Sequence, residues 1–134
     1  MKTTLTLVAA LVIGLAAATE AGAFEHFQSP SGNIGCVLDR HGVRCDIAER
    51  EWTPPPKPDW CELDWGQGIA LGRHGRAEIV CAGDTTLHAE QVLAYGDSLR
   101  RGRFRCTSKR SGMRCVNRRN DHGFVLSRER EKRF

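Results

Sequence analysis

The residues best suited to chemistry in this sequence are arginines, and they crowd one stretch of the chain. Nine basic residues fall within it: Arg100, Arg101, Arg103, Arg105, Lys109, Arg110, Arg114, Arg118 and Arg119. The planar guanidinium fork suits phosphate and carboxylate groups, which it can bind through two parallel hydrogen bonds. On a β-strand, Arg101, Arg103 and Arg105 would share one face. The sequence therefore predicts an anion-binding stripe with these candidate residues: Arg101, Arg103, Arg105, Arg110 and Arg114.

The charge of the chain is divided between its two parts. Residues 24–99 carry six Lys and Arg against twelve Asp and Glu, whereas residues 100–134 carry thirteen against three. A region this basic can bind an anionic envelope polymer, anionic lipid headgroups or a protein through its field. Few aromatic residues interleave with the arginines, which makes nucleic acid an unlikely partner. The alternative is a solvated surface, part of it paired with the acidic region.

A metal site is a second possibility, because Cys36, His41 and Cys45 form the pattern C-x4-H-x3-C. Zinc would need about four ligands of this type, with the thiols deprotonated. The related stretch later in the chain has Ser111 at the position of His41. We therefore expect no metal and no cofactor.

Catalytic groups are present but form no recognisable motif. Ser127, His122 and Asp84 could supply a nucleophile, a base and an orienting carboxylate, yet no nucleophile-elbow sequence accompanies them. We expect Asp84 to cap a turn through its own side chain and His122 to bond the backbone. Glu62 and Asp64 would share a strand face and could act as a carboxylate pair. A solvated face is the commoner explanation, so no catalytic residue is predicted.

Four of the six cysteines belong to a sequence motif that occurs twice in the chain. The pattern C-x5-G-x-R-C runs from Cys36 to Cys45 and again from Cys106 to Cys115. Each copy predicts a tight hairpin in which a glycine of positive φ follows the turn. Six cysteines allow 15 pairings. The repeat favours Cys36 with Cys45 and Cys106 with Cys115, which leaves Cys61 with Cys81.

Residues 1–23 have the form of a secretory signal peptide. Lys2 precedes an apolar stretch over residues 5–18, and the small residues 21–23 place cleavage before Phe24. The apolar stretch is too short to span a bilayer comfortably, so we expect no transmembrane anchor after cleavage. An even number of cysteines also fits an oxidising compartment. The expected location is extracellular, periplasmic or at the cell surface.

Residues 24–134 are expected to form a single exported domain, with 100–134 as its basic C-terminal part. Short apolar runs separated by glycine turns indicate an all-β fold, either a disulfide-stapled sandwich or a barrel-like sheet, with two similar cysteine hairpins. Residues 46–52 could form one helical turn, and residues 60–65 alternate like a strand. Residues 87–95 fit a helix or a strand, and we favour strand or loop.

Several motifs resemble one family. They are Ser29-Pro30-Ser31-Gly32-Asn33-Ile34-Gly35-Cys36, Trp52-Thr53-Pro54-Pro55-Pro56, Asp64-Trp65-Gly66-Gln67-Gly68, Val80-Cys81-Ala82-Gly83-Asp84-Thr85, Leu93-Ala94-Tyr95-Gly96 and His122-Gly123-Phe124-Val125-Leu126-Ser127-Arg128. The chain is similar to small exported bacterial proteins, common in actinobacteria, that are grouped as a domain of unknown function. The resemblance implies an exported domain with paired cysteines and supplies no catalytic residue.

Together these features predict a non-enzymatic exported module that binds an anionic envelope component or a protein. One alternative is a secreted enzyme inhibitor that inserts a hairpin tip, either Arg40-His41 or Arg110-Ser111, into an active site. A small hydrolase that uses the acidic, Trp-rich segment is the other alternative.

Overall fold

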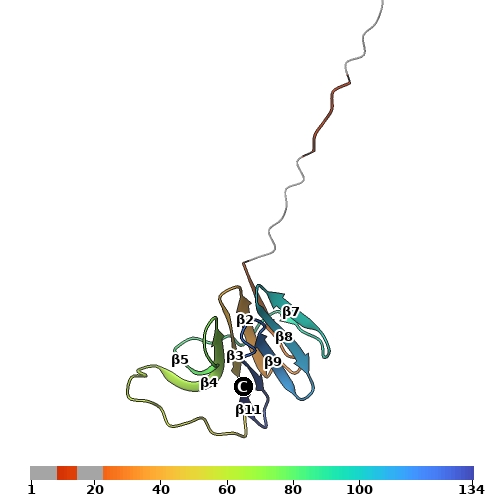
Figure 1. Cartoon of the computed structure of the whole chain (residues 1–134). Coiled ribbons are helices and arrows are strands. Elements are labelled where there is room, and N and C mark those ends of the chain that lie inside the picture. The colour runs from red at the N-terminus through yellow and green to blue at the C-terminus, as the bar shows by residue number, and fades with distance from the viewer. Residues whose placement is uncertain (1–8, 15–22) are drawn as a thin grey trace, which may run out of the picture.

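The computed structural model describes residues 9–14 and 23–134, so most of the expected signal peptide lies outside the described residues. Within these ranges, no helix has the length and apolar character needed to cross a membrane. The regular elements are all β-strands, and they form two sheets that pack face to face (Figure 1). The predicted all-β sandwich with disulfides is therefore confirmed.

The two sheets follow the same plan. The first contains β1 (Phe24–Gln28), β2 (Ile34–Asp39), β3 (Gly42–Ile47), β4 (Asp64–Gly72), β5 (Glu78–Ala82) and β6 (Gln91–Val92). The second contains β7 (Ser98–Arg101), β8 (Phe104–Lys109), β9 (Gly112–Asn117), β10 (Gly123–Leu126) and β11 (Glu131–Arg133). The strand orders are β5-β4-β3-β2-β1-β6 and β11-β10-β9-β8-β7. Each sheet is thus a five-stranded antiparallel meander, and the first adds β6 parallel to β1.

The core lies between the two sheets and takes side chains from both. Its largest fully buried apolar side chains are Phe27, Leu38, Ile69, Leu71, Phe104, Met113, Phe124 and Leu126. Burial of one such side chain contributes roughly 1.5–3 kcal/mol. Inward and outward residues alternate along β8, as expected for a sheet with one solvated face. This alternation places Phe104, Cys106 and Ser108 in the core and turns Arg105 outward.

The two repeated hairpins place their disulfides in this core. Cys36 is paired with Cys45 and Cys106 with Cys115, as the repeat predicts. Each pair lies directly opposite across two antiparallel strands, and Cys45 Sγ is 3.9 Å from Cys115 Sγ. The two disulfides therefore touch where the sheets meet. With Cys36 and Cys45 joined, the C-x4-H-x3-C pattern has no thiolate to offer zinc.

The third predicted disulfide, Cys61 to Cys81, also forms. It depends on an irregularity in the β4–β5 pairing, where the register shifts between Trp65 and Ile69. Gly66 sits in this irregularity with a φ of 86°, and a Cβ there would lie 2.6 Å from Pro54 Cγ. Glycine is therefore required both for the backbone conformation and for the approach of the proline-rich segment.

Several local expectations were wrong. Residues 46–52 form the end of β3 followed by bends, with no helical turn. β4 begins only at Asp64, so residues 60–63 are not a strand.

The two hairpin glycines differ in conformation. Gly112 has a positive φ of 134°, as expected, but Gly42 does not have a positive φ. A Cβ at Gly42 would lie 2.7 Å from the carbonyl oxygen of Leu71, so close packing selects this glycine. Residues 87–95 are loop except for the two-residue β6, as favoured.

Candidate functional site

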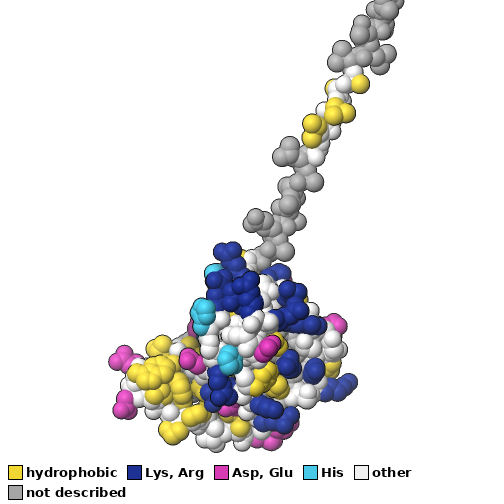
Figure 2. Space-filling view, viewed as in Figure 1, with side chains coloured by type: hydrophobic (Ala, Val, Ile, Leu, Met, Phe, Trp, Pro, Cys, Tyr) yellow, Lys and Arg dark blue, Asp and Glu magenta, His cyan; other side chains and the backbone are white. Residues whose placement is uncertain are grey.

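Four turns from both sheets meet at one end of the sandwich and form an open hollow of about 640 Å³. The turns connect β2 to β3, β4 to β5, β7 to β8 and β9 to β10. The lining is six arginines and one glycine: Arg40, Arg73, Arg100, Gly102, Arg103, Arg118 and Arg119. Figure 2 shows dark blue side chains gathered at the upper end of the domain. We call this feature the arginine hollow.

A buried asparagine joins two of the four turns. The Asn117 side chain is fully buried, and its amide donates to the carbonyl oxygens of Gly72 at 3.3 Å and Arg73 at 3.1 Å. Its own carbonyl oxygen accepts a hydrogen bond from the backbone N–H of Arg119 at 3.0 Å. One side chain therefore fixes the turns that carry Arg73 and Arg119. This pre-organisation lowers the ordering cost of binding a ligand between them.

The other two turns are also fixed by specific contacts. Asp39 Oδ1 accepts hydrogen bonds from the N–H groups of His41 at 2.7 Å and Gly42 at 3.0 Å, which shapes the turn that carries Arg40. Gly102 has a φ of 54°, and a Cβ there would lie 3.5 Å from Arg40 Cβ. The β7–β8 turn of the second sheet thus lies directly against the β2–β3 turn of the first.

The electrostatics of the hollow favour an anion. Among the described residues, none of its six arginines forms a salt bridge with a carboxylate. Arg103 is held by a backbone bond in which the N–H of Arg118 donates to its carbonyl oxygen at 2.8 Å. Partial loss of water, followed by the positive charges of Arg119 and Arg73, lowers the pKa of Arg103 below its usual value. An anion in the hollow would relieve this repulsion and accept several charge-assisted hydrogen bonds.

The sequence profile of the Family of unknown function (DUF6636) matches residues 6–134. The chain belongs to the DUF6636 family. No curated protein and no solved structure matches the chain significantly.

In this DUF6636 domain, the predicted stripe is broken by a turn. Arg101 ends β7 and Arg105 lies in β8, with Gly102 and Arg103 in the turn between them. The expectation that the three arginines lie along one strand is therefore wrong, because the positive φ of Gly102 reverses the chain. Arg101 forms an ion pair with Glu25 of β1. Of the three, only Arg103 lines the arginine hollow.

Two other predicted residues lie next to the hollow. Arg105 and Arg114 are exposed on the outer face of the second sheet, where they line a depression of about 430 Å³ together with Arg118 and one carboxylate, that of Asp121. Because Arg118 also lines the arginine hollow, the two depressions adjoin. The guanidinium of Arg114 lies 5.1 Å from the ring centre of Phe134. These contacts extend the basic surface from the end of the sandwich onto its side.

The fifth predicted residue, Arg110, is far from this surface, at the opposite hairpin tip, with its guanidinium 4.9 Å from the ring centre of Tyr95. The sequence argument also missed contributions from the first half of the chain. Arg40 entered the sequence argument only as part of a hairpin tip, and Arg73 and Asn117 received no role in it. Only the topology of the sheets brings the turns that carry Arg40, Arg73 and Arg119 beside Arg103.

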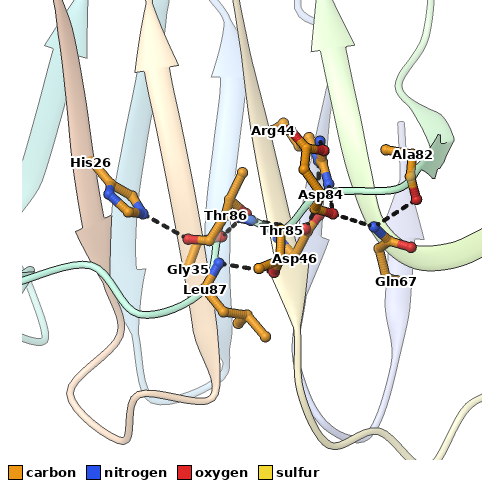
Figure 3. Close-up of polar contacts among 10 residues, drawn as sticks. All are labelled: His26, Gly35, Arg44, Asp46, Gln67, Ala82, Asp84, Thr85, Thr86 and Leu87. Carbon is orange, nitrogen blue, oxygen red and sulfur yellow. Dashed lines mark hydrogen bonds and ion pairs between the residues drawn. The ribbon is translucent and has the colours of Figure 1, made fainter. Parts of the chain in front are cut away.

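Three charged residues of the acidic part of the chain, Arg44, Asp46 and Asp84, form an internal network (Figure 3). Arg44 donates to both oxygens of the fully buried Asp46 carboxylate, at 3.0 and 2.7 Å, and to Asp84 Oδ1 at 2.8 Å. The Thr86 N–H donates to the same Asp46 carboxylate at 3.0 Å, and Gln67 donates to the Asp84 carbonyl at 2.7 Å. The segment after β5 is thereby fixed across the first sheet. The expectation that Asp84 caps a turn is wrong, because its carboxylate accepts from Arg44.

This network shifts two pKa values. The hydrogen bond from Arg44, and then its positive charge, lower the pKa of Asp84. Partial burial of Arg44 disfavours its charged form, but hydrogen bonds to Asp46 and Asp84 outweigh that effect and raise its pKa. Both groups are therefore ionised at neutral pH.

The catalytic alternatives are not assembled. Nδ1 of His122 lies 3.2 Å from the carbonyl oxygen of the last residue, in line with the expected backbone bond. The Ser127 hydroxyl is engaged with the backbone N–H and carbonyl of Arg130, both at 3.2 Å. Glu62 precedes β4 and Asp64 begins it, so the expectation that they share a strand face is wrong. None of these groups forms a nucleophile–base pair in the described residues.

Proposed function

We propose that this domain is a non-enzymatic exported module that binds an anionic envelope component at the arginine hollow. The observation that carries the proposal is the convergence of six arginines without a carboxylate in the lining. Like charges repel one another, so side chains that only solubilise a surface would be expected to spread apart or to alternate with acidic residues. Three disulfides are typical of proteins of oxidising compartments, which supports export.

The shape of the basic surface supports a ligand with repeated phosphate or carboxylate groups. The arginine hollow continues through Arg118 to the depression that Arg105 and Arg114 line. Arginine can bind each anionic group through its fork, and each charge-assisted hydrogen bond contributes about 1.5–3 kcal/mol. A polymer or a layer of anionic headgroups could occupy both depressions together. A single small anion would use only the hollow.

The test is binding of the mature domain to phosphatidylglycerol vesicles and to a polyglycerol-phosphate polymer across a salt series. A triple variant of the hollow, Arg40→Gln, Arg73→Gln and Arg119→Gln, should weaken binding at least about tenfold and flatten the salt dependence, because fewer counterions are released. A matched triple variant, Lys57→Gln, Arg130→Gln and Lys132→Gln, removes the same charge outside the hollow. It should retain binding within about threefold, since only the long-range field changes.

Two outcomes would contradict the proposal. Equal losses in the two triple variants would mean that net charge, and not the hollow, attracts the ligand. Absence of binding to both probes at low salt would leave the basic surface without this role. The exposed tip Arg40-His41 would then be the next feature to test, against a panel of secreted enzymes.

A further inference from the structure

The opposite end of the sandwich contains a second hollow, of about 490 Å³, that the arginine hollow does not explain. It opens between the β1–β2 turn of the first sheet and the β8–β9 tip of the second. Its inner wall includes the three buried serines Ser29, Ser108 and Ser127. We call it the serine hollow. Its volume lies within the range of small-molecule sites, about 300–1,000 Å³.

One of these serines lacks an internal partner. The side chain of Ser108 is almost completely buried, with a relative exposure of 1%, and its Oγ has no hydrogen-bond partner among the described residues. The other two are engaged, since Ser29 Oγ accepts from the Ile34 N–H at 3.1 Å and Ser127 Oγ bonds the backbone of Arg130. A buried hydroxyl without a hydrogen-bond partner destabilises the fold. A ligand group that reaches Ser108 would remove this destabilisation.

The other residues that line the serine hollow indicate which chemical class of ligand would fit. Charges of both signs occur on the rim, where Arg128 and Glu49 approach within 3.6 Å of each other and Glu129 lies nearby in the sequence. Ile34 and Met113 supply buried apolar surface. This mixture differs from the arginine hollow, where every charge is positive. It gives little preference to an anion.

We propose that the serine hollow binds a neutral sugar. A serine hydroxyl both donates and accepts, as do the hydroxyl groups of a sugar ring, so the two can satisfy each other. The outer hydroxyls of the ring would meet carboxylate and guanidinium groups at the rim, and its apolar face would lie on the exposed ring of Tyr95. Tyr95, which is 41% exposed and stacked under Arg110, closes one side. This site is separate from the arginine hollow and does not depend on it.

The experiment is an NMR titration of the isotope-labelled domain with N,N′-diacetylchitobiose and with maltose. At least one sugar should shift the backbone amide signals of Ser108, Gly112 and Asn33. Ser108→Ala should weaken binding at least fivefold and should leave the melting temperature unchanged or raised, because the hydroxyl lacks a partner. Ser111→Ala is the matched control: it makes the same change at the exposed tip, outside the lining, and should bind like the wild type.

A second variant, Tyr95→Ala, alters the exposed rim and should also weaken sugar binding without unfolding the domain. Inorganic phosphate is the probe for the other end, and its shifts should cluster around Gly102 and Arg119. Failure of both sugars to shift the serine hollow would overturn the proposal, and so would wild-type binding by Ser108→Ala. A melting temperature lowered by Ser108→Ala would also contradict it, since the hydroxyl would then have a structural role. None of the sugar-binding results bears on binding at the arginine hollow.

Discussion

The two copies of C-x5-G-x-R-C form hairpins that are alike inside the sandwich and different outside it. In each copy the cysteines face each other with Cα atoms 4.1 Å apart, and the disulfide is buried in the common core. In each, the glycine after the turn lies against a carbonyl oxygen of the next strand, at Leu71 for Gly42 and Leu126 for Gly112. Packing therefore accounts for the cysteines and the glycine that the two hairpins share.

The arginine of the repeat is Arg44 in the first copy and Arg114 in the second, and the two make different contacts. Arg44 is engaged by Asp46 and Asp84, and it holds a crossing segment on the first sheet. Arg114 forms no salt bridge among the described residues, stacks near Phe134 and lines a basic depression. The comparison teaches that the first hairpin uses the arginine of the repeat for the structure of the domain, whereas the second presents it to the surroundings. Three predictions can break or sharpen this contrast.

The largest effect should come from loss of the disulfides. Each closed loop is expected to contribute about 2–4 kcal/mol, against a total stability of about 5–15 kcal/mol for a domain of this kind. Complete reduction should therefore unfold the domain, with loss of the near-ultraviolet circular dichroism signal. The double variants Cys36→Ala/Cys45→Ala and Cys106→Ala/Cys115→Ala should lose similar stability in urea, because both disulfides have a sequence separation of 9. A full signal after complete thiol reduction, or very unequal losses, would break the equivalence of the hairpins.

The second-largest effect should distinguish the structural role of Arg44 from the role of Arg114. Arg44→Ala leaves the buried Asp46 carboxylate without its charged partner and should reduce the free energy of unfolding by about 2–4 kcal/mol. Arg114→Ala should change it by less than about 0.5 kcal/mol, because the side chain is exposed. Urea unfolding measures both changes in free energy. Anion binding should show the reverse order, with a larger loss for Arg114→Ala than for Arg44→Ala. Similar losses of stability for the two variants would contradict the division of roles.

The smallest effect concerns pH. The pKa of Asp84 is lowered in the folded state by Arg44, so its ion pair stabilises the fold above the unfolded pKa, near 3.9, and loses this contribution as pH falls through the lowered value. Asp84→Asn should be slightly less stable than the wild type at pH 7. The difference should shrink below about pH 4 in thermal melts, since protonation then removes the same charge from the wild type. A difference that persists unchanged in acid would show that the carboxylate charge is not the cause.

The fold could be predicted from local patterns because they are repeated. The spacing of Cys36, Cys45, Cys106 and Cys115, with glycine in each turn, specified two hairpins and their disulfides. The Cys61–Cys81 pairing followed by elimination, and the structure shows the irregularity near Gly66 that allows it. Short strands without helical periodicity then indicated an all-β fold, for which a sandwich and a barrel-like sheet were the two alternatives.

The candidate site could be predicted only in part, because it is assembled from turns distant in sequence. The richness in arginine was evident, and Arg103, Arg105 and Arg114 do belong to the basic surface. Reading Gly102 as a strand position instead of a turn misplaced the stripe. The contribution of Arg40 depends on how the sheets face each other, which no local pattern encodes.

The strands at the sheet edges have a further consequence for behaviour at high concentration. Unpaired edges can recruit strands from other molecules and so lead to aggregation. In this domain β6 covers the side of β1 with only two residues, β11 has three, and β7 carries Arg100 and Arg101. The short strands β6 and β11 and the positively charged strand β7 offer poor templates for intermolecular pairing, which leaves β5 as the longest edge strand. Arg100, which lines the arginine hollow, thus also discourages edge-to-edge association.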